Sequence, residues 1–123
     1  MQDNDDQLSL NDETDYGLCF ACGPQNPIGL QLIFKRVEGG IKTTFLGTEE
    51  HQGFPGYVHG GIITAILDEV MSRVALLENR WAVTANLNVR FRKPISIKEP
   101  LIAVAEKTRE VRGFLEAKGQ VKL

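Results

Sequence analysis

The sequence of 123 residues predicts a single α+β domain in which one helix packs against a β-sheet. Several segments alternate strictly between apolar and polar residues, which is typical of half-buried strands. One stretch, from 59 to about 77, is apolar nearly all round, as expected for a helix buried against a sheet. The composition, 42% apolar and 24% charged, is that of an ordinary globular protein.

The first 29 residues are predicted to lie outside the sheet. Residues 1–16 carry acidic side chains and no basic ones, and we expect a flexible acidic tail. Residues 17–29 contain Gly23-Pro24 and Asn26-Pro27, dipeptides that mark turns, so an ordered loop is expected there. The domain is therefore expected to span 17–123.

Five strands follow from composition and periodicity. Residues 30–37 and 41–46 are rich in β-branched and aromatic residues and flank Gly39-Gly40, a pair that permits a tight hairpin turn. Regular alternation predicts three further strands, at 81–92, 101–111 and 115–123.

Charge, hydropathy and cysteine content exclude several classes of protein. A net charge of -2 and a pI near 5.7 argue against a nucleic-acid partner. No apolar run is long enough for a membrane span, and the N-terminus is acidic where a signal peptide is basic. The only cysteines, Cys19 and Cys22, are too few to staple a secreted fold, so we expect a cytoplasmic protein with reduced thiols and no membrane partner.

One stripe of the predicted helix differs from the rest. Its residues are small or polar at helical spacing and would admit a ligand or another backbone: Gly61, Ala65, Asp68, Ser72 and Ala75. Asp68 is the only charge on the stripe. Its apolar neighbours Leu67 and Met71 are expected to strip it of water, so that it can activate a water molecule or attack a carbonyl directly.

The start of the helix suits an oxyanion. Gly60 and Gly61 leave backbone N–H groups unpaired and uncovered by side chains, at the positive end of the helix dipole. Helix rise, however, separates Gly60 from Asp68 by roughly 12 Å. One carbonyl cannot touch both, so cooperation requires a two-fold dimer with antiparallel central helices.

Three stretches of sequence together resemble one family. CFACGPQNPIGLQLIF, HQGFPGYVHGGIITAILDEVMSRV and AVTANLNVRFRKPI look like the hotdog-fold thioesterases of the phenylacetate-pathway (PaaI-like) group. The resemblance covers residues 17–123. It implies a long central helix wrapped by an antiparallel sheet, homodimers that often pair into homotetramers, and hydrolysis of acyl-CoA without a metal or cofactor.

The resemblance also implies roles for individual residues. The family's HGG motif maps to His59, Gly60 and Gly61, with the Gly60 N–H as oxyanion donor and the His59 ring positioning the loop. Asp68 occupies the position of the catalytic carboxylate. Thr84 falls where related enzymes place a Ser or Thr that orients water or the carboxylate.

Substrate-binding candidates flank this motif. Many relatives have an Asn or Gln six residues before the motif histidine, where this chain has Gly53 and places Gln52 one residue earlier. Arg90 and Arg92, next to Lys93, could hold the phosphates of coenzyme A or simply form a solvated strand end.

Other features carry alternatives. Cys19 and Cys22 have the spacing of half a zinc site or a redox pair, but without a second such pair we expect small buried thiols and no metal. Arg73 follows Glu69 at i+4, which predicts an ion pair. Family members usually continue with another strand after 115–123, so we expect either that the family's last strand is missing from this chain or that the sheet is completed differently.

The sequence thus predicts an acyl-CoA thioesterase acting as a homodimer or a dimer of dimers. The main alternative is a non-catalytic acyl-CoA-binding hotdog module in which Asp68 is only structural. A hotdog hydratase or dehydratase is a weaker alternative, because Asp68 is the only acid on the stripe.

Overall fold

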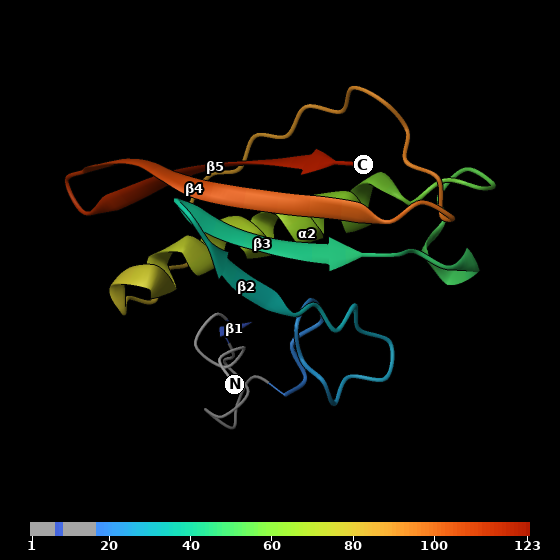
Figure 1. Cartoon of the computed structure of the whole chain (residues 1–123), viewed down its shortest axis with the longest axis horizontal. Coiled ribbons are helices and arrows are strands. Elements are labelled where there is room, and N and C mark those ends of the chain that lie inside the picture. Colours follow the sequence, from blue (N-terminus) through green and yellow to red (C-terminus); the bar gives the residue numbers. More distant parts are fainter. Residues whose placement is uncertain (1–6, 9–16) are drawn as a thin grey trace.

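The computed structural model describes residues 7–8 and 17–123. In this part of the chain an antiparallel sheet of five strands in the order β1-β2-β3-β4-β5 lies against one α-helix, α2, which crosses its back face (Figure 1). The predicted α+β class is confirmed. The strands are β1 (Gln7–Leu8), β2 (Phe34–Val37), β3 (Gly40–Phe45), β4 (Leu101–Val111) and β5 (Phe114–Lys122). The helical elements are η2 (Glu49–His51), α2 (Gly60–Ser72) and η3 (Arg73–Glu78).

Four predicted strands are confirmed, with shifted ends. The prediction for 101–111 matches β4, and those for 41–46 and 115–123 match β3 and β5 within one residue. The strand predicted at 30–37 begins only at Phe34, because residues before it bind the preceding loop. The backbone N–H groups of Leu30 and Leu32 donate to the carbonyls of Phe20 and Ala21.

The strand predicted at 81–92 is wrong. This segment runs as irregular chain beyond β5 (Figure 1), and three of its large apolar side chains are exposed, Trp81 by 59%, Val83 by 93% and Phe91 by 57%. Alternation shows that one face is apolar, but a strand also needs a backbone partner. Among the described residues β5 pairs only with β4, and the 81–92 segment makes no ladder with the open edge of β5.

The helix predicted over 59–77 is confirmed, although its last turns tighten. α2 buries Ile63, Ile66, Leu67 and Val70 against the sheet. From Arg73 the chain continues as the 3₁₀ helix η3 and ends at Asn79, whose φ of 58° closes the helix.

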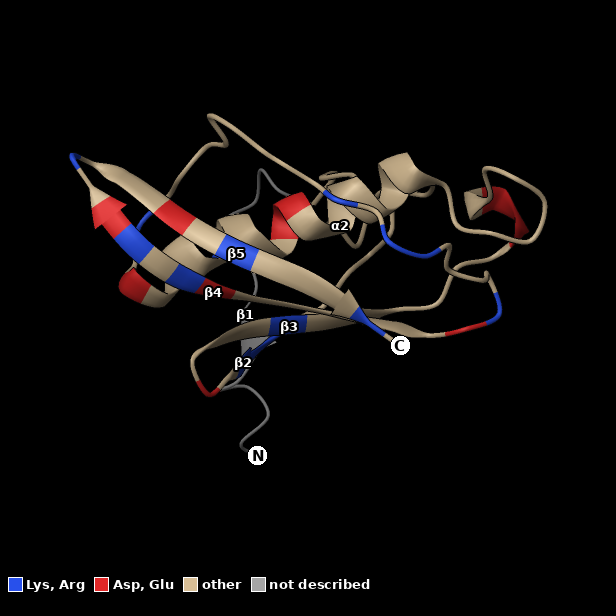
Figure 2. Cartoon of the chain, turned by 90° about the horizontal axis from the view of Figure 1, so that it is seen from above, with Lys and Arg blue, Asp and Glu red and all other residues tan. Residues whose placement is uncertain are grey.

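The predicted acidic tail, 1–16, lies outside the described residues except for β1, which pairs antiparallel with β2. Charged side chains of both signs occur along β4 and β5, whereas the charged residues of α2 are the adjacent carboxylates Asp68 and Glu69 (Figure 2). None of the helices in the described residues has the length and apolarity that a membrane crossing requires.

Candidate active site

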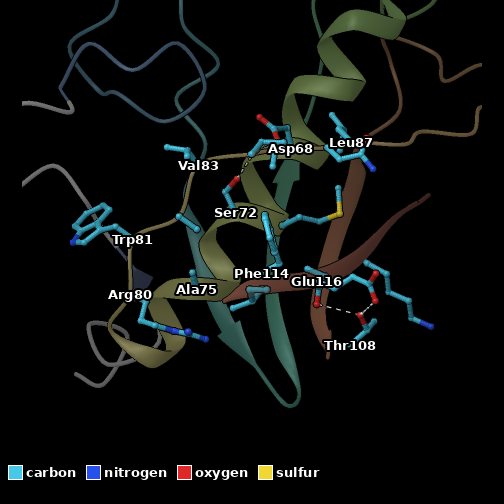
Figure 3. A pocket seen from close by; sticks show the side chains of 18 of the residues that line it. Asp68, Ser72, Ala75, Arg80, Trp81, Val83, Leu87, Thr108, Phe114 and Glu116 are labelled. Carbon is cyan, nitrogen blue, oxygen red and sulfur yellow. Dashed lines mark hydrogen bonds between the residues drawn. The ribbon is translucent and has the colours of Figure 1, made fainter. Parts of the chain in front are cut away.

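Asp68 and Thr84 meet where α2 faces the 81–92 segment. The Thr84 hydroxyl donates a hydrogen bond of 2.6 Å to Oδ1 of Asp68, and the Ser72 hydroxyl, one turn further along the helix, lies 3.4 Å from the Thr84 hydroxyl (Figure 3). The side chains at i and i+4 share a helix face, which is why α2 presents Asp68 and Ser72 together. The chain thus builds a small polar cluster around one carboxylate.

This cluster forms part of the wall of a cleft of about 810 Å³ between the 81–92 segment and the β4–β5 hairpin (Figure 3). Both apolar and polar side chains line the cleft, among them Met71, Ala75, Leu87, Phe114 and Glu116. Of the small and polar helix stripe, Asp68, Ser72 and Ala75 line the cleft. A cleft of this size with a few convergent polar groups is typical of a small-molecule site.

The environment of Asp68 is more open than the sequence predicts. Leu67 is buried, but Asp68 itself is half-buried and borders the cleft. The single chain therefore does not strip the carboxylate of water. Helix residues beside a buried position point away from the core when the helix packs with only one face against the sheet.

The helix start has the geometry of a capped N-terminus with one spare donor. Nδ1 of His59 accepts a hydrogen bond of 2.8 Å from the Gly61 N–H, so the neutral ring carries its proton on Nε2. Within the described part of the chain the Gly60 N–H meets no acceptor. The ring of Phe91 lies 3.4 Å from the point that a Cβ on Gly60 would occupy.

The single chain does not bring these two groups together. Gly60 and Asp68 lie on the same helix eight residues apart, which corresponds to about 12 Å along its axis. Neither His59 nor Gly60 lines the cleft that Asp68 borders. The donor and the carboxylate therefore belong to separate surfaces of one protomer.

The predicted substrate-binding residues lie around these surfaces. Oε1 of Gln52 accepts a hydrogen bond of 2.6 Å from the Gly56 N–H, so this side chain stabilises the turn before the helix. Arg90 and Arg92 are exposed on the irregular segment and lie outside the cleft lining.

Arg80, which lines the cleft, belongs to a cluster of ion pairs. The Arg80 guanidinium bridges Glu78 and Glu110, at 2.6 and 2.8 Å, and Lys107 joins the same two carboxylates. Hydrogen bonds from Arg80 and Lys107 lower the pKa of Glu110 to about 2, and the same network raises the pKa of Arg80. This cluster ties the end of η3 to β4.

Sequence analysis missed two features of this region. The Ser72 hydroxyl beside Thr84 was predicted only as part of the stripe. The ion pair between Glu69 and Arg73 is confirmed at 3.5 Å, but the sequence does not reveal that Cys19 and Cys22 pack against the same carboxylate. A contact between a loop and a helix 47 residues later leaves no periodic signal. Burial and a hydrogen bond with Cys19 raise the pKa of Cys22 to about 12.

Comparison with solved structures identifies the fold. The chain superimposes on a solved thioesterase superfamily protein with a TM-score of 0.79 at 24% identity, over 85% of this chain and 52% of the other. It also superimposes on a phenylacetic acid degradation-related protein of Ralstonia eutropha with a TM-score of 0.67 at 23% identity, over 76% and 75% of the two chains. These likenesses confirm the hotdog arrangement that the sequence resemblance predicts.

Comparison of sequences identifies the family. The mouse acyl-coenzyme A thioesterase THEM4 is 40% identical over 73 residues, which are 59% of this chain and 30% of the mouse protein. The chain thus spans less than a third of the length of this curated relative. The model of the thioesterase superfamily matches residues 55–121, more than half of the chain. With this match and the shared fold, the chain belongs to the thioesterase superfamily.

Proposed function

We propose that this chain hydrolyses acyl-CoA thioesters to a free acid and coenzyme A. The observation that carries the proposal is the Asp68 carboxylate, which Thr84 holds at 2.6 Å in the wall of a cleft large enough for an acyl chain. Membership of the thioesterase superfamily and the similarity to THEM4 support the same reaction.

Asp68 supplies the basic group of the reaction. As a general base it takes a proton from water, and the resulting hydroxide adds to the thioester carbonyl. The tetrahedral intermediate then expels the coenzyme A thiolate, which takes up the proton. Alternatively, the carboxylate attacks the carbonyl itself, expels the coenzyme A thiolate and forms an anhydride. Water then cleaves the anhydride, which releases the acid, regenerates the Asp68 carboxylate and supplies the proton that the thiolate takes up. In both routes Thr84 orients the carboxylate.

The oxyanion is stabilised by the partner subunit. The spare Gly60 N–H lies at a helix N-terminus, where the backbone dipoles favour negative charge. Because about 12 Å separate it from Asp68 on one helix, each site takes Gly60 from one protomer and Asp68 from the other. A two-fold homodimer with antiparallel α2 helices has two such sites, and two dimers can pair into a homotetramer.

The remaining residues serve this arrangement. His59 fixes the loop by accepting from Gly61, and Gln52 fixes the turn before it by accepting from Gly56. Arg90 and Arg92 are exposed and free to bind the phosphates of coenzyme A.

The test is the rate of thiol release from acyl-CoAs of graded chain length by the purified full chain. Asp68→Asn keeps the shape of the side chain and removes its basicity, so turnover should fall at least about 100-fold. Glu99→Gln, an exposed carboxylate outside the cleft, is the matched control and should keep full activity.

Unchanged turnover in Asp68→Asn would refute the proposal. A wild-type chain that is stabilised thermally by acyl-CoA but never cleaves it would instead be a non-catalytic acyl-CoA-binding module.

A further inference from the structure

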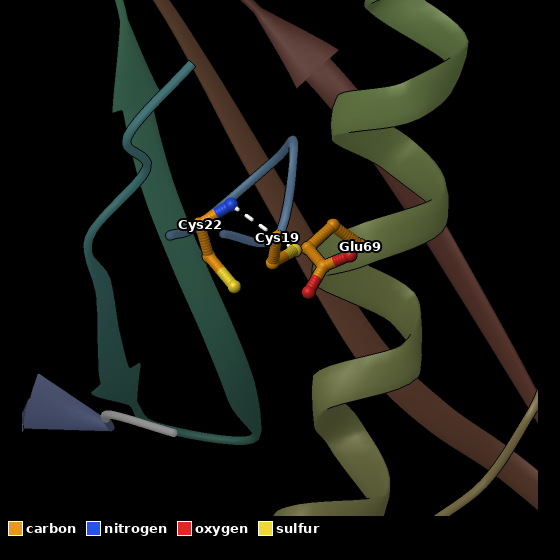
Figure 4. A group of neighbouring side chains, drawn as sticks. All are labelled: Cys19, Cys22 and Glu69. Atoms are coloured by element: carbon orange, nitrogen blue, oxygen red, sulfur yellow. Dashed lines mark hydrogen bonds between the residues drawn. The ribbon is translucent and has the colours of Figure 1, made fainter. Parts of the chain in front are cut away.

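Two thiols and a carboxylate from distant parts of the chain lie close together beside α2. Cys19 and Cys22 lie in the loop before β2, and Glu69 lies on α2 (Figure 4). Their sulfur and oxygen atoms all lie within 4.8 Å of one another. Bound to one tetrahedral zinc ion at ordinary bond lengths of about 2.0–2.3 Å, such atoms would lie about 3.5–3.8 Å apart, so the most widely separated pair must close by about 1 Å.

The loop is already shaped to present both sulfurs. The Cys22 N–H points at Sγ of Cys19 over 3.4 Å, and the Gly23 N–H donates to the Cys19 carbonyl at 2.8 Å. A Cβ at residue 23 would collide with the Gly17 carbonyl oxygen, so the turn requires glycine directly after the cysteine pair.

The local charge balances with a divalent ion in place. Arg73 is only 3% exposed, and its Nε lies 3.5 Å from one carboxylate oxygen of Glu69. With both sulfurs as thiols, Glu69 and Arg73 sum to zero. A divalent cation that displaces the two thiol protons leaves the sum at zero again. The buried region therefore avoids the large cost of an uncompensated charge in either state.

The donor set selects the metal. Two soft thiolates and one carboxylate favour Zn²⁺ over Mg²⁺ or Ca²⁺, which prefer oxygen ligands alone. Zinc takes four ligands, and three from the protein leave one position for water. That position has access to a cavity, because the three residues share a cavity lining with Asp68 and Thr84.

We propose that Cys19, Cys22 and Glu69 bind one zinc ion whose remaining position is taken by water from this cavity. The sequence shows only half of a zinc site, and the structure supplies the third ligand from the helix. The site joins the loop to α2 on the turn that carries Asp68, and it does not depend on the proposed hydrolysis.

The first test uses the full chain, reduced, freed of metal with a chelator and then titrated with Zn²⁺. Elemental analysis after removal of unbound metal should give about one zinc per chain. The double variant Cys19→Ser, Cys22→Ser should retain less than about a tenth of that. Co²⁺ in place of zinc should give a thiolate-to-cobalt charge-transfer absorption in the wild type and not in the double serine variant.

The second test isolates the carboxylate. Glu69→Gln should weaken zinc binding about tenfold or more, whereas Glu99→Gln, an exposed glutamate away from the cluster, should bind as the wild type does. Circular dichroism of each variant checks that it folds, and the wild-type titration stands without any variant.

Three results would overturn the proposal: a reduced wild-type chain that takes up no zinc, zinc content unchanged in the double serine variant, or cobalt binding without the sulfur absorption. A purified chain whose measured mass is lower by two hydrogen atoms contains a disulfide. If such a chain still fails to bind zinc after reduction, the two cysteines form a redox pair in place of a metal site.

Discussion

The hydroxyl of Thr84 donates its proton to the carboxylate of Asp68 over 2.6 Å, and this bond joins α2 to the irregular segment that follows it. The same hydroxyl lies 3.4 Å from that of Ser72, so it is held from a second side. A carboxylate free to rotate would present its lone pairs in many directions. Here one oxygen is occupied, and the other can face a water molecule or a carbonyl in the cleft.

Removing that hydroxyl should slow the reaction without unfolding the chain. Thr84→Val keeps the shape of the side chain and removes the hydroxyl. A hydrogen bond to a charged group is worth about 1.5–3 kcal/mol, and if that free energy is lost from the transition state, kcat should fall at least about tenfold. KM should change little, since Thr84 acts on Asp68 and not on the acyl chain. Thr84→Ser restores the donor and should recover most of the rate. Equal rates for the valine variant and the wild type would show that Thr84 does not position Asp68.

A sharper test removes the oxyanion donor while keeping the helix. Gly60 is the first helical residue, and the preceding His59 is extended with ψ of 136°, a conformation compatible with proline next to it. Gly60→Pro therefore deletes one N–H group at a position where helices tolerate proline. Turnover should fall about 100-fold or more, whereas Gly60→Ala retains the N–H and serves as the control.

Subunit mixing then asks where the donor comes from. Gly60→Pro and Asp68→Asn should each be inactive alone. If each site combines both residues from different protomers, a mixed dimer has one intact site and one doubly defective site. Equal mixing and random exchange should then restore about a quarter of the wild-type rate. Background activity in a mixture with demonstrated exchange would contradict the shared site.

Sequence periodicity predicted the strands whose backbone hydrogen bonds are made within a local hairpin. The β2–β3 and β4–β5 hairpins pair locally, so alternation and turn residues suffice to place them. The 81–92 segment carries equally regular alternation, yet a strand also needs a backbone partner, and this segment makes no ladder with the strands of the described residues. Periodicity indicates which face of a segment is apolar, but it does not indicate which strand, if any, the segment pairs with.

The candidate site was predictable to the extent that it lies on one helix. Asp68 and Gly60 share α2, so their separation follows from helix rise. The contact of Thr84 with Asp68 came from resemblance and not from spacing. The packing of Cys19 and Cys22 against Glu69 is a tertiary contact between a turn and a helix, and no local sequence pattern predicts such a contact.

The β3–β4 pairing supplies a stability prediction at Gly40. A Cβ on this residue would collide with the backbone carbonyl of Ala105, which cannot move without breaking the ladder between the two strands. Gly40→Ala should lower the free energy of unfolding by about 3 kcal/mol, seen as a lower urea midpoint.

The adjacent Gly39 provides the matched control. It has φ of 82° and open space around it, so Gly39→Asn, which tolerates that conformation, should cost less than about 1 kcal/mol. Similar losses at both positions would show that turn strain, and not the close approach to Ala105, limits residue 40.

The ion-pair cluster around Glu110 predicts a pH response. Hydrogen bonds from Arg80 and then Lys107 lower the pKa of this carboxyl from 4.5 to about 2 in the folded chain. A lowered folded pKa means that its stabilising contribution is present above pH 4.5 and is lost as the pH falls through about 2. The side chain of Glu110 is exposed to solvent, so salt should weaken the effect.

Carbon-13 NMR of the Glu110 carboxyl checks this directly, with an expected midpoint near pH 2 at low salt. Arg80→Gln removes the guanidinium that lowers this pKa most and should move the midpoint upward toward 4.5. Arg112 lies on the nearby hairpin turn and has no ion pair among the described residues, so Arg112→Gln should leave the midpoint unchanged. A wild-type midpoint near 4.5 would mean that the guanidinium does not hold this carboxylate in solution, and that the Lys107–Glu78 ion pair links η3 to β4 without help from Glu110.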